Sequence, residues 1–500
     1  ITGGTVSLTV NNTAMTAKGI ALYAGTAADF EWRQDFSGSS NVETRIAAKA
    51  TLDAGMRDLF DVYMRDRIEG PVPINFIYEE RRDNTETFSA GLNLTDSTFT
   101  LPGFEWQKSR GAKATAEIAV LMTDGRITAL PEFRVDAGDF RVAGKSTFSA
   151  PANDAGSVNP ESNSGSSSAN NSANNSAGDA IVETLDIERF ILGNTSFSAT
   201  VRRAPDRSFI IDVSGGGFDA APFISEDLGG IDAPELPAFN LTGTFGRFWI
   251  GQGEPTSNVR MELKRKSTRW ERIVVEGALP DGGKAISIKM LPNPDGHDLQ
   301  IYSADAGSLL KAMDVTDTIR TGVIEISGVR KGGPDAPWRG IAEMKRFSVA
   351  DAPNFARLLT LASLTGINDT ISGKGISFSR LRFPYVFENE IATIEEARAV
   401  GSELGITATG QIDFGKDAID INGTIIPAYT INSLLGQIPV IGTILTGAKG
   451  GGIFAASYKI SGPVDKPIIS VNPLSALAPG FLRKLLDVTG KNSTDGRSPD

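Results

Sequence analysis

Few side chains in this sequence could perform chemistry. The chain has no cysteine and a single histidine, His297, which excludes thiol nucleophiles, disulfides, Cys/His zinc sites and any Ser-His-Asp triad away from that residue. His297 follows a Pro-Asn-Pro-Asp-Gly segment, a composition typical of a turn between strands. The nearby Asp295 and Asp298 supply too few oxygen ligands for a calcium loop. We therefore interpret His297 as an exposed turn residue.

Other motifs give no catalytic set. Residues 138–146 (GDFRVAGKS) resemble a phosphate loop but carry five residues between the glycines where that loop has four. Residues 447–452 (GAKGGG) could wrap a phosphate, although such glycines more often permit a tight turn. Acidic pairs such as Glu79 with Glu80 have no identified partner carboxylate. The sequence therefore neither supports nor excludes a hydrolase that uses two carboxylates. We predict no enzyme activity, no cofactor and no metal.

The charge of the chain bears on its partners. With 49 Lys and Arg against 60 Asp and Glu the net charge is −11, which argues against a nucleic-acid partner. One basic run, residues 264–272 (KRKSTRWER), could contact anionic lipid headgroups or a polyanion. In a β-rich protein such a run is more often a solvated hairpin end, and we favour that interpretation.

Period-2 alternation of apolar residues is the dominant pattern and predicts a mostly β protein. Because Thr, Ser, Lys and Asp occupy the alternate positions, the strands are expected to be antiparallel with one apolar face. The alternating apolar positions are Val6, Leu8 and Val10; Ile74, Phe76 and Tyr78; Ile286, Ile288 and Met290; Ile324 and Ile326; Ile419 and Ile421; and Phe454, Ala456, Tyr458 and Ile460.

A few short helices are expected in one recurring context. Asp-Ala dipeptides at Asp53, Asp219, Asp305 and Asp351 each precede a segment in which the aspartate can cap a helix. A Gly-led strand follows each of them, more loosely after Asp53 and Asp219. We interpret strand, short helix and strand as a degenerate internal repeat.

Composition also divides the chain. Ser, Asn, Ala and Gly without aromatic residues fill 157–178, which predicts a disordered loop or linker. The predicted segments are 1–150, a β-repeat segment; 151–180, the linker; 181–345, a second β segment; 346–487, a C-terminal region; and 488–500, a frayed tail. The start at Ile1, without methionine, signal peptide or anchor, suggests a fragment of a longer protein. No run approaches the roughly 20 apolar residues of a membrane-spanning helix.

The C-terminal region contains two apolar stripes at helical spacing, interrupted by Pro and Gly. They either cap the end of the β core, which we favour, or insert into a membrane interface or lipid groove, and the two roles are compatible. The candidate cap or membrane-contact residues are Leu434, Leu435, Ile438, Leu477, Phe481 and Leu485.

Four motifs of the last third of the chain resemble a known family. They are residues 351–359 (DAPNFARLL), 364–367 (LTGI), 423–429 (GTIIPAY) and 471–481 (VNPLSALAPGF). Together they resemble the C-terminal region of AsmA-like, bridge-like lipid transport proteins of the YhdP type in Gram-negative bacteria. The resemblance weakens through the β segments before them and is absent from the linker.

The resemblance implies a periplasmic protein, tethered to the inner membrane by an N-terminal helix that is not in this fragment. Its fold would be an elongated, curled antiparallel sheet of repeated units that forms a hydrophobic groove, with C-terminal capping helices. Its function would be to carry phospholipid between the inner and outer membranes. On this interpretation the candidate groove residues are Ile286, Ile288, Met290, Ile324, Ile326, Phe454, Tyr458 and Ile460.

One alternative is a non-catalytic scaffold of the cell envelope. In that case the apolar faces would close into a dry sandwich, and the C-terminal segment would bind a protein partner. An open apolar face and a sealed core would distinguish the two.

Overall fold

The computed structural model describes residues 3–23, 26–53, 68–101, 103–104, 106–149, 181–225, 237–266, 269–280, 283–333, 335–350, 375–427, 456–464 and 466–472. These residues form 28 strands and two short helices. Of the strands, 25 belong to one open antiparallel sheet and three to a small second sheet. The expected mostly β fold with few helices is confirmed.

Tertiary contacts divide the chain into two units. Unit 1 comprises Ile1–Phe223 and Pro237–Arg247, and unit 2 comprises Ile224–Leu236 and Phe248–Asp500. This division falls inside the segment 181–345 that composition suggested, whose boundaries stay a prediction. The linker 151–180, the helices expected after Asp53 and Asp351, and the C-terminal caps lie outside the described residues.

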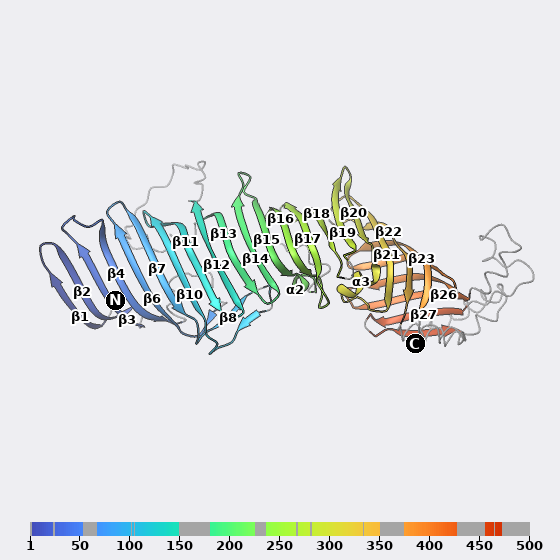
Figure 1. Ribbon diagram of the computed structural model, residues 1–500, viewed down its shortest axis with the longest axis horizontal. Helices are drawn as coiled ribbons and strands as arrows, with labels where there is room; N and C mark the ends of the chain where they lie inside the picture. Colours follow the sequence, from blue (N-terminus) through green and yellow to red (C-terminus); the bar gives the residue numbers. More distant parts are fainter. Residues whose placement is uncertain are drawn as a thin grey trace, which may run out of the picture. The chain divides into compact units, whose positions relative to one another are not determined.

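Unit 1 is a meander in which each strand of the large sheet pairs with the next one along the chain (Figure 1). β5, β8 and β9 leave this order and form the small sheet. The strands are β1 Gly4–Val10, β2 Ala14–Tyr23, β3 Thr26–Asp35, β4 Val42–Leu52, β5 Ile68–Glu69, β6 Val72–Arg81, β7 Thr85–Asn93, β8 Thr98–Leu101, β9 Trp106–Lys108, β10 Thr115–Thr123, β11 Arg126–Ala137, β12 Phe140–Ser149, β13 Ile181–Leu192, β14 Thr195–Arg203 and β15 Phe209–Asp219, followed by β16 Phe239–Trp249, whose last two residues belong to unit 2.

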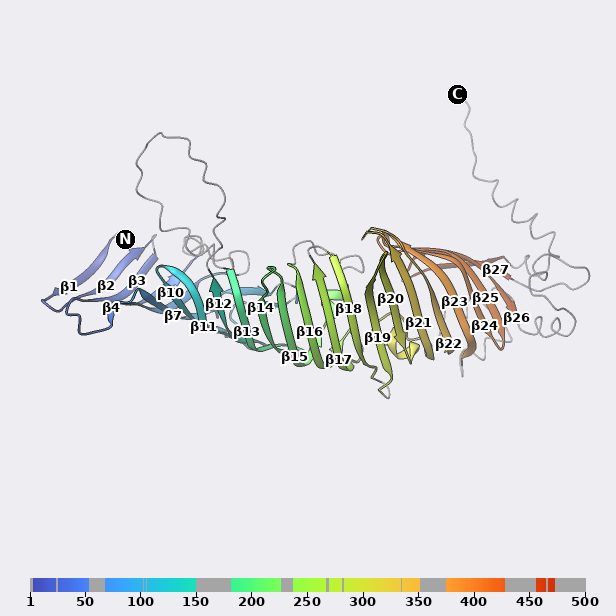
Figure 2. The ribbon, with the colours of Figure 1, turned by 90° about the horizontal axis from the view of Figure 1, so that it is seen from above.

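Unit 2 continues the same pattern, and Figure 2 shows its strands following one another around a curved sheet. The strands are β17 Thr256–Lys266, β18 Arg269–Ala278, β19 Ala285–Asn293, β20 Gly296–Ser303, β21 Ile319–Lys331, β22 Trp338–Val349, β23 Ile376–Glu388, β24 Ile391–Gly401, β25 Leu404–Asp413, β26 Ala418–Pro427, β27 Ala456–Pro463 and β28 Ile468–Asn472.

Both described helices begin where an Asp-Ala dipeptide predicts one, namely α2 (Ala221–Ser225) and α3 (Ala306–Ala312). Asp305 caps α3, since its Oδ1 accepts a hydrogen bond from Ser308 N at 3.2 Å. Lys284 Nζ lies 2.6 Å from the other carboxylate oxygen of Asp305 and holds the cap in place. Leu309 of α3 is buried against β21 and β22, so the helix covers one end of their apolar face.

In unit 1 the small sheet has a similar covering role. Lys108 of β9 is 3 % exposed, and its ammonium donates hydrogen bonds to the backbone carbonyls of Thr95, Ser97 and Ser109. Three carbonyl acceptors satisfy the three donors of the ammonium group, which makes its burial tolerable. Phe99 of β8 then packs against Phe140 of the large sheet, with ring centroids 6.0 Å apart.

Two tyrosines of unit 2 lie across glycines of the neighbouring strand. Tyr458 is opposite Gly423 in the register of β26 and β27, and its hydroxyl donates a 2.9 Å hydrogen bond to the carbonyl of Thr407 in β25. Tyr385 is opposite Gly340, and its hydroxyl reaches the carbonyl of Ser327 at 3.4 Å. In both cases the glycine leaves room for the ring to cross a strand.

Burial raises the pKa of Tyr458 from 10.0 to about 12. Because the native state favours the neutral phenol, this stabilisation is complete below pH ~10 and is lost as the pH rises toward 12. We expect unit 2 to lose about 2 kcal/mol of unfolding free energy across that window. Denaturant unfolding at pH ~10 and pH ~12 should show a smaller loss of unfolding free energy for Tyr458→Phe than for the unmodified protein. An equal loss in both proteins would contradict this expectation.

Candidate functional site

The register of unit 2 places apolar side chains in rows that run from strand to strand. Directly opposite residues of paired antiparallel strands point to the same face, so the side chains of one row lie side by side. The central row begins Val275, Ile288, Ile301, Ile326, Ala342 and Phe383, on β18 to β23. At about 4.8 Å between strands these six residues span about 24 Å.

Two further apolar rows flank the central row on the same face. The first contains Ile286, Ser303, Ile324, Met344, Leu381, Ala399, Ile406, Ile425 and Ala456. The second contains Ile273, Met290, Leu299, Gly328, Gly340, Tyr385, Ile394, Gly410, Ile421, Ile460 and Ile469. We call the three rows together the apolar face of unit 2.

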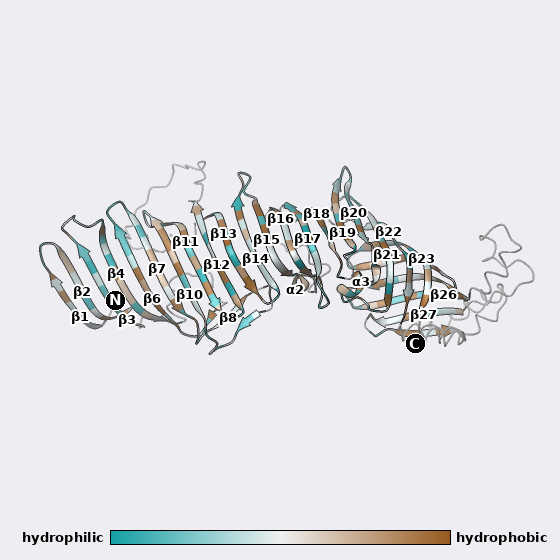
Figure 3. Cartoon of the chain, in the orientation of Figure 1, coloured by the Kyte–Doolittle hydropathy of each residue, from teal (hydrophilic) through white to brown (hydrophobic). Residues whose placement is uncertain are grey.

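The opposite face of these strands is polar and charged, and Figure 3 shows the resulting alternation of hydropathy along them. One row of that face reads Glu276, Ser287, Tyr302, Glu325, Glu343, Arg382, Arg398, Thr407, Thr424 and Ser457. Lys345 lies 3.0 Å from Glu325 and 2.9 Å from Glu343. Hydrogen bonds from Lys345 and Arg380 lower the pKa of Glu343, as expected for a solvated ion-pair network.

The apolar face of unit 2 is only partly covered. Ile286, Ile324 and Met344, in the row next to α3, are buried. In the central row Ile301 and Ile326 are only half-buried. Among the described residues of unit 2, α3 is the only complete element outside the large sheet, and Ala342 of the central row is buried as well.

The structure brings most of the predicted groove residues together on this face. They are Ile286, Ile288, Met290, Ile324, Ile326, Tyr458 and Ile460. Phe454 and the six cap candidates Leu434, Leu435, Ile438, Leu477, Phe481 and Leu485 lie outside the described residues. Sequence analysis missed Leu299 and Ile301, although they alternate with polar residues in β20.

Unit 1 has an apolar face of its own, which sequence analysis identified at Val6, Leu8 and Val10 and at Ile74, Phe76 and Tyr78. Its central row runs through Phe30, Ala48, Phe76, Ala90, Ile118 and Phe133. The alternation Asp29-Phe30-Glu31-Trp32 in β3 is a signal that could have extended it. Further along, aromatic rings occupy the face, and Phe190 stacks on Phe197 with centroids 4.7 Å apart.

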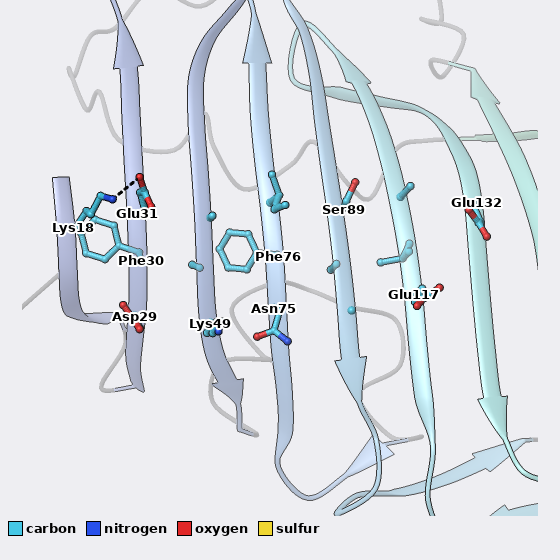
Figure 4. A pocket seen from close by; sticks show the side chains of 17 residues that line it. Lys18, Asp29, Phe30, Glu31, Lys49, Asn75, Phe76, Ser89, Glu117 and Glu132 are labelled. Atoms are coloured by element: carbon cyan, nitrogen blue, oxygen red, sulfur yellow. Dashed lines mark ion pairs between the residues drawn. The ribbon is translucent and has the colours of Figure 1, made fainter. Parts of the chain in front are cut away.

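A hollow of about 760 Å³ extends across β2 to β11 (Figure 4). Its lining includes Phe30, Phe76 and Ile118 from the row, but most of it comes from residues at the alternate positions, such as Glu31 and Glu117, which point to the opposite face. Lys18 and Glu31 form an ion pair of 2.9 Å at one end of it. The volume is in the range of small-ligand sites.

His297 differs from its expected place. It lies in β20, just after the turn, and is half-buried instead of exposed. Burial lowers its pKa, and the adjacent Arg330 lowers it further, while Glu271 and Asp298 oppose the shift. The imidazole is therefore mainly neutral at pH 7.

The arrangement offers extended apolar contact. In the part of the chain that the structure describes, no three His, Cys, Asp or Glu side chains gather as metal ligands would. Neither helix of the described residues is long and apolar enough to cross a membrane.

The chain matches no protein-family model, no curated protein and no solved structure.

Proposed function

We propose that this protein binds phospholipid by its acyl chains on the apolar face and transfers it between the inner and outer membranes. The observation that carries the proposal is the central row of unit 2, which is apolar across six successive strands and in which Ile301 and Ile326 are only half-buried. A continuous apolar surface of this kind is rarely left uncovered unless something binds it.

The dimensions suit an acyl chain. One leaflet of a bilayer has a hydrocarbon thickness of about 15 Å, half of the ~30 Å core. The central row spans about 24 Å, so a chain of that length fits along it. Each methylene group that leaves water gains about 0.8 kcal/mol, and a chain can therefore move along such a face without any chemical step.

The resemblance to AsmA-like proteins supports the same proposal and adds its setting. On that basis the protein is periplasmic, tethered to the inner membrane by a helix outside this fragment, and not an enzyme. Of its four motifs, the one at residues 423–429 has its first five residues in β26.

The alternative, an envelope scaffold with a closed core and a protein partner at its C-terminus, fits this face less well. A closed sandwich would bury the central row. Ile301 and Ile326, which are only half-buried, favour a groove.

Photo-crosslinking tests the proposal in the intact protein. A photoreactive amino acid at Ile301 or Ile326 is expected to yield a phospholipid adduct by mass spectrometry, because both side chains point to the apolar face. The matched controls are Gln300 and Ser327, which are paired in the same strands and point to the opposite face. Equal adducts at all four positions, or none at any, would refute the proposal.

A further inference from the structure

The central row of unit 2 changes character between β21 and β22. On β18 to β21 its side chains are only half-buried, whereas Ala342 on β22 is 2 % exposed. The half-buried residues are Val275, Ile288, Ile301 and Ile326. Three inter-strand distances separate the first of them from the last, so the accessible stretch of the row is about 14 Å long. An acyl chain that spans one leaflet of a bilayer, about 15 Å, would fill this stretch from end to end.

Larger side chains surround Ala342 on three sides within the apolar face. Ile326 and Phe383 are directly opposite it, on β21 and β23. Met344 follows two residues later on β22, in the row next to α3. On the fourth side lies Gly340, which has no side chain. A slot would therefore remain open beside Ala342 unless a side chain from another strand filled it.

The ring of Tyr385 fills this slot. Tyr385 is directly opposite Gly340, and its hydroxyl reaches back across β22 to the carbonyl of Ser327 on β21. A Cβ atom at Gly328, the next position of the same row, would lie 2.7 Å from that hydroxyl. Gly328 is buried although it has no side chain, which is consistent with a ring that lies over it.

Tyr385 is held less firmly than Tyr458, the other tyrosine of unit 2 that crosses a glycine. Tyr458 is 7 % exposed, and its hydroxyl donates a hydrogen bond of 2.9 Å. Tyr385 is half-buried, and its hydroxyl lies 3.4 Å from the carbonyl oxygen of Ser327. Because 3.4 Å is long for a hydrogen bond, packing holds this ring more than bonding does. Tyr458 thus belongs to the packing of β25 to β27, whereas Tyr385 borders the accessible stretch.

We propose that Tyr385 sets the length of acyl chain that unit 2 accepts, because its ring closes the central row where the accessible stretch ends. The inference rests on the proposed function and adds the class of lipid, one whose acyl chain spans β18 to β21. Each two methylenes that the row buries strengthen binding about tenfold, whereas methylenes beyond the ring stay in water and add nothing. Affinity should therefore rise with chain length and then level off.

The test measures how tightly the full chain binds lysophosphatidylcholines with saturated acyl chains of increasing length, each below its micelle-forming concentration. Tyr385→Leu removes the ring and keeps an apolar residue. Its affinity should level off at a longer chain, and the longest chains should bind about tenfold more tightly than to the unmodified protein. Tyr385→Phe, which restores the ring, should restore the limit. Tyr302→Leu, at an exposed tyrosine on the opposite face of β20, should leave the limit in place.

Gly328→Ala reaches the same site without a change at Tyr385. The new Cβ atom would lie too close to the tyrosine hydroxyl, while its next neighbours, on Trp338 and Leu299, would be at ordinary contact distances of 3.6 and 3.7 Å. The ring must then withdraw from β21, so the limit should again move to longer chains. In the Tyr385→Phe protein, which lacks the hydroxyl, the same substitution should have a much smaller effect.

The other outcomes overturn the inference in distinct ways. If affinity never levels off, or levels off at the same length in Tyr385→Leu and Gly328→Ala as in the unmodified protein, Tyr385 is not the limit while lipid binding stands. If circular dichroism shows that Tyr385→Leu does not fold, Gly328→Ala decides alone. If no chain length binds to the unmodified protein, the proposed function fails as well.

Discussion

Aspartate at both Ile301 and Ile326 is expected to reduce phospholipid binding by about 100-fold, since an acyl chain that loses contact with some four methylenes at ~0.8 kcal/mol each loses about 3 kcal/mol. The two isoleucines are opposite each other in β20 and β21, at the middle of the central row. Two carboxylates there would keep water on the face and interrupt the row. Lipid that co-purifies with each protein, quantified by mass spectrometry, measures the effect.

The control for this variant is aspartate at both Gln300 and Ser327. These residues are also opposite each other in β20 and β21, but on the polar face, so the same added charge should leave lipid binding unchanged. Circular dichroism of the two double variants should be alike. Normal lipid content in the Ile301 and Ile326 variant would show that the central row does not carry the lipid.

Gly423→Val is expected to destabilise unit 2 by about 3–4 kcal/mol, beyond the usual cost of overpacking, because backbone as well as a side chain must move. A Cβ atom at Gly423 would lie 2.0 Å from the carbonyl oxygen of Thr407 and 2.5 Å from the hydroxyl of Tyr458. Relief of these contacts would separate β25 from β26 and break the hydrogen bond of Tyr458. The melting temperature should fall by about 10 °C.

Gly333→Ala provides the comparison within the same unit. Nothing lies within 4 Å of a Cβ atom at Gly333, which is in the loop after β21. Its melting temperature should therefore stay within about 2 °C of that of the unmodified protein. A Gly423 variant that melts like the Gly333 variant would mean that β25 and β26 are not packed as described.

Local patterns in the sequence were sufficient to predict which of these segments form strands and which form helices. Alternation at Ile286, Ile288 and Met290 predicts β19, and the Asp-Ala start at Asp305 predicts α3, because strand pleating and helix capping depend on residues close in sequence. The choice of apolar face for the groove candidates follows from the same period of two.

These patterns could not predict how the strands pair or in which register. The register that aligns Ile288 with Ile301 and Ile326 depends on turn lengths and pairing. The run 264–272 looks solvated because nothing local shows that Arg265 is buried. Likewise, no pattern around Gly423 shows that the ring of Tyr458, more than thirty residues later, occupies the space that a side chain at position 423 would fill.

The meander order of the strands has a consequence for how such a protein can vary in length. Since neighbouring strands are about 4.8 Å apart, one added or removed hairpin would change the length of an apolar face by about 10 Å. Because each strand within a unit pairs with the next strand of the large sheet along the chain, the other pairings would keep their partners. The number of hairpins thus sets the length of the apolar face, which can change in steps of one hairpin while the remaining strands keep their pairings.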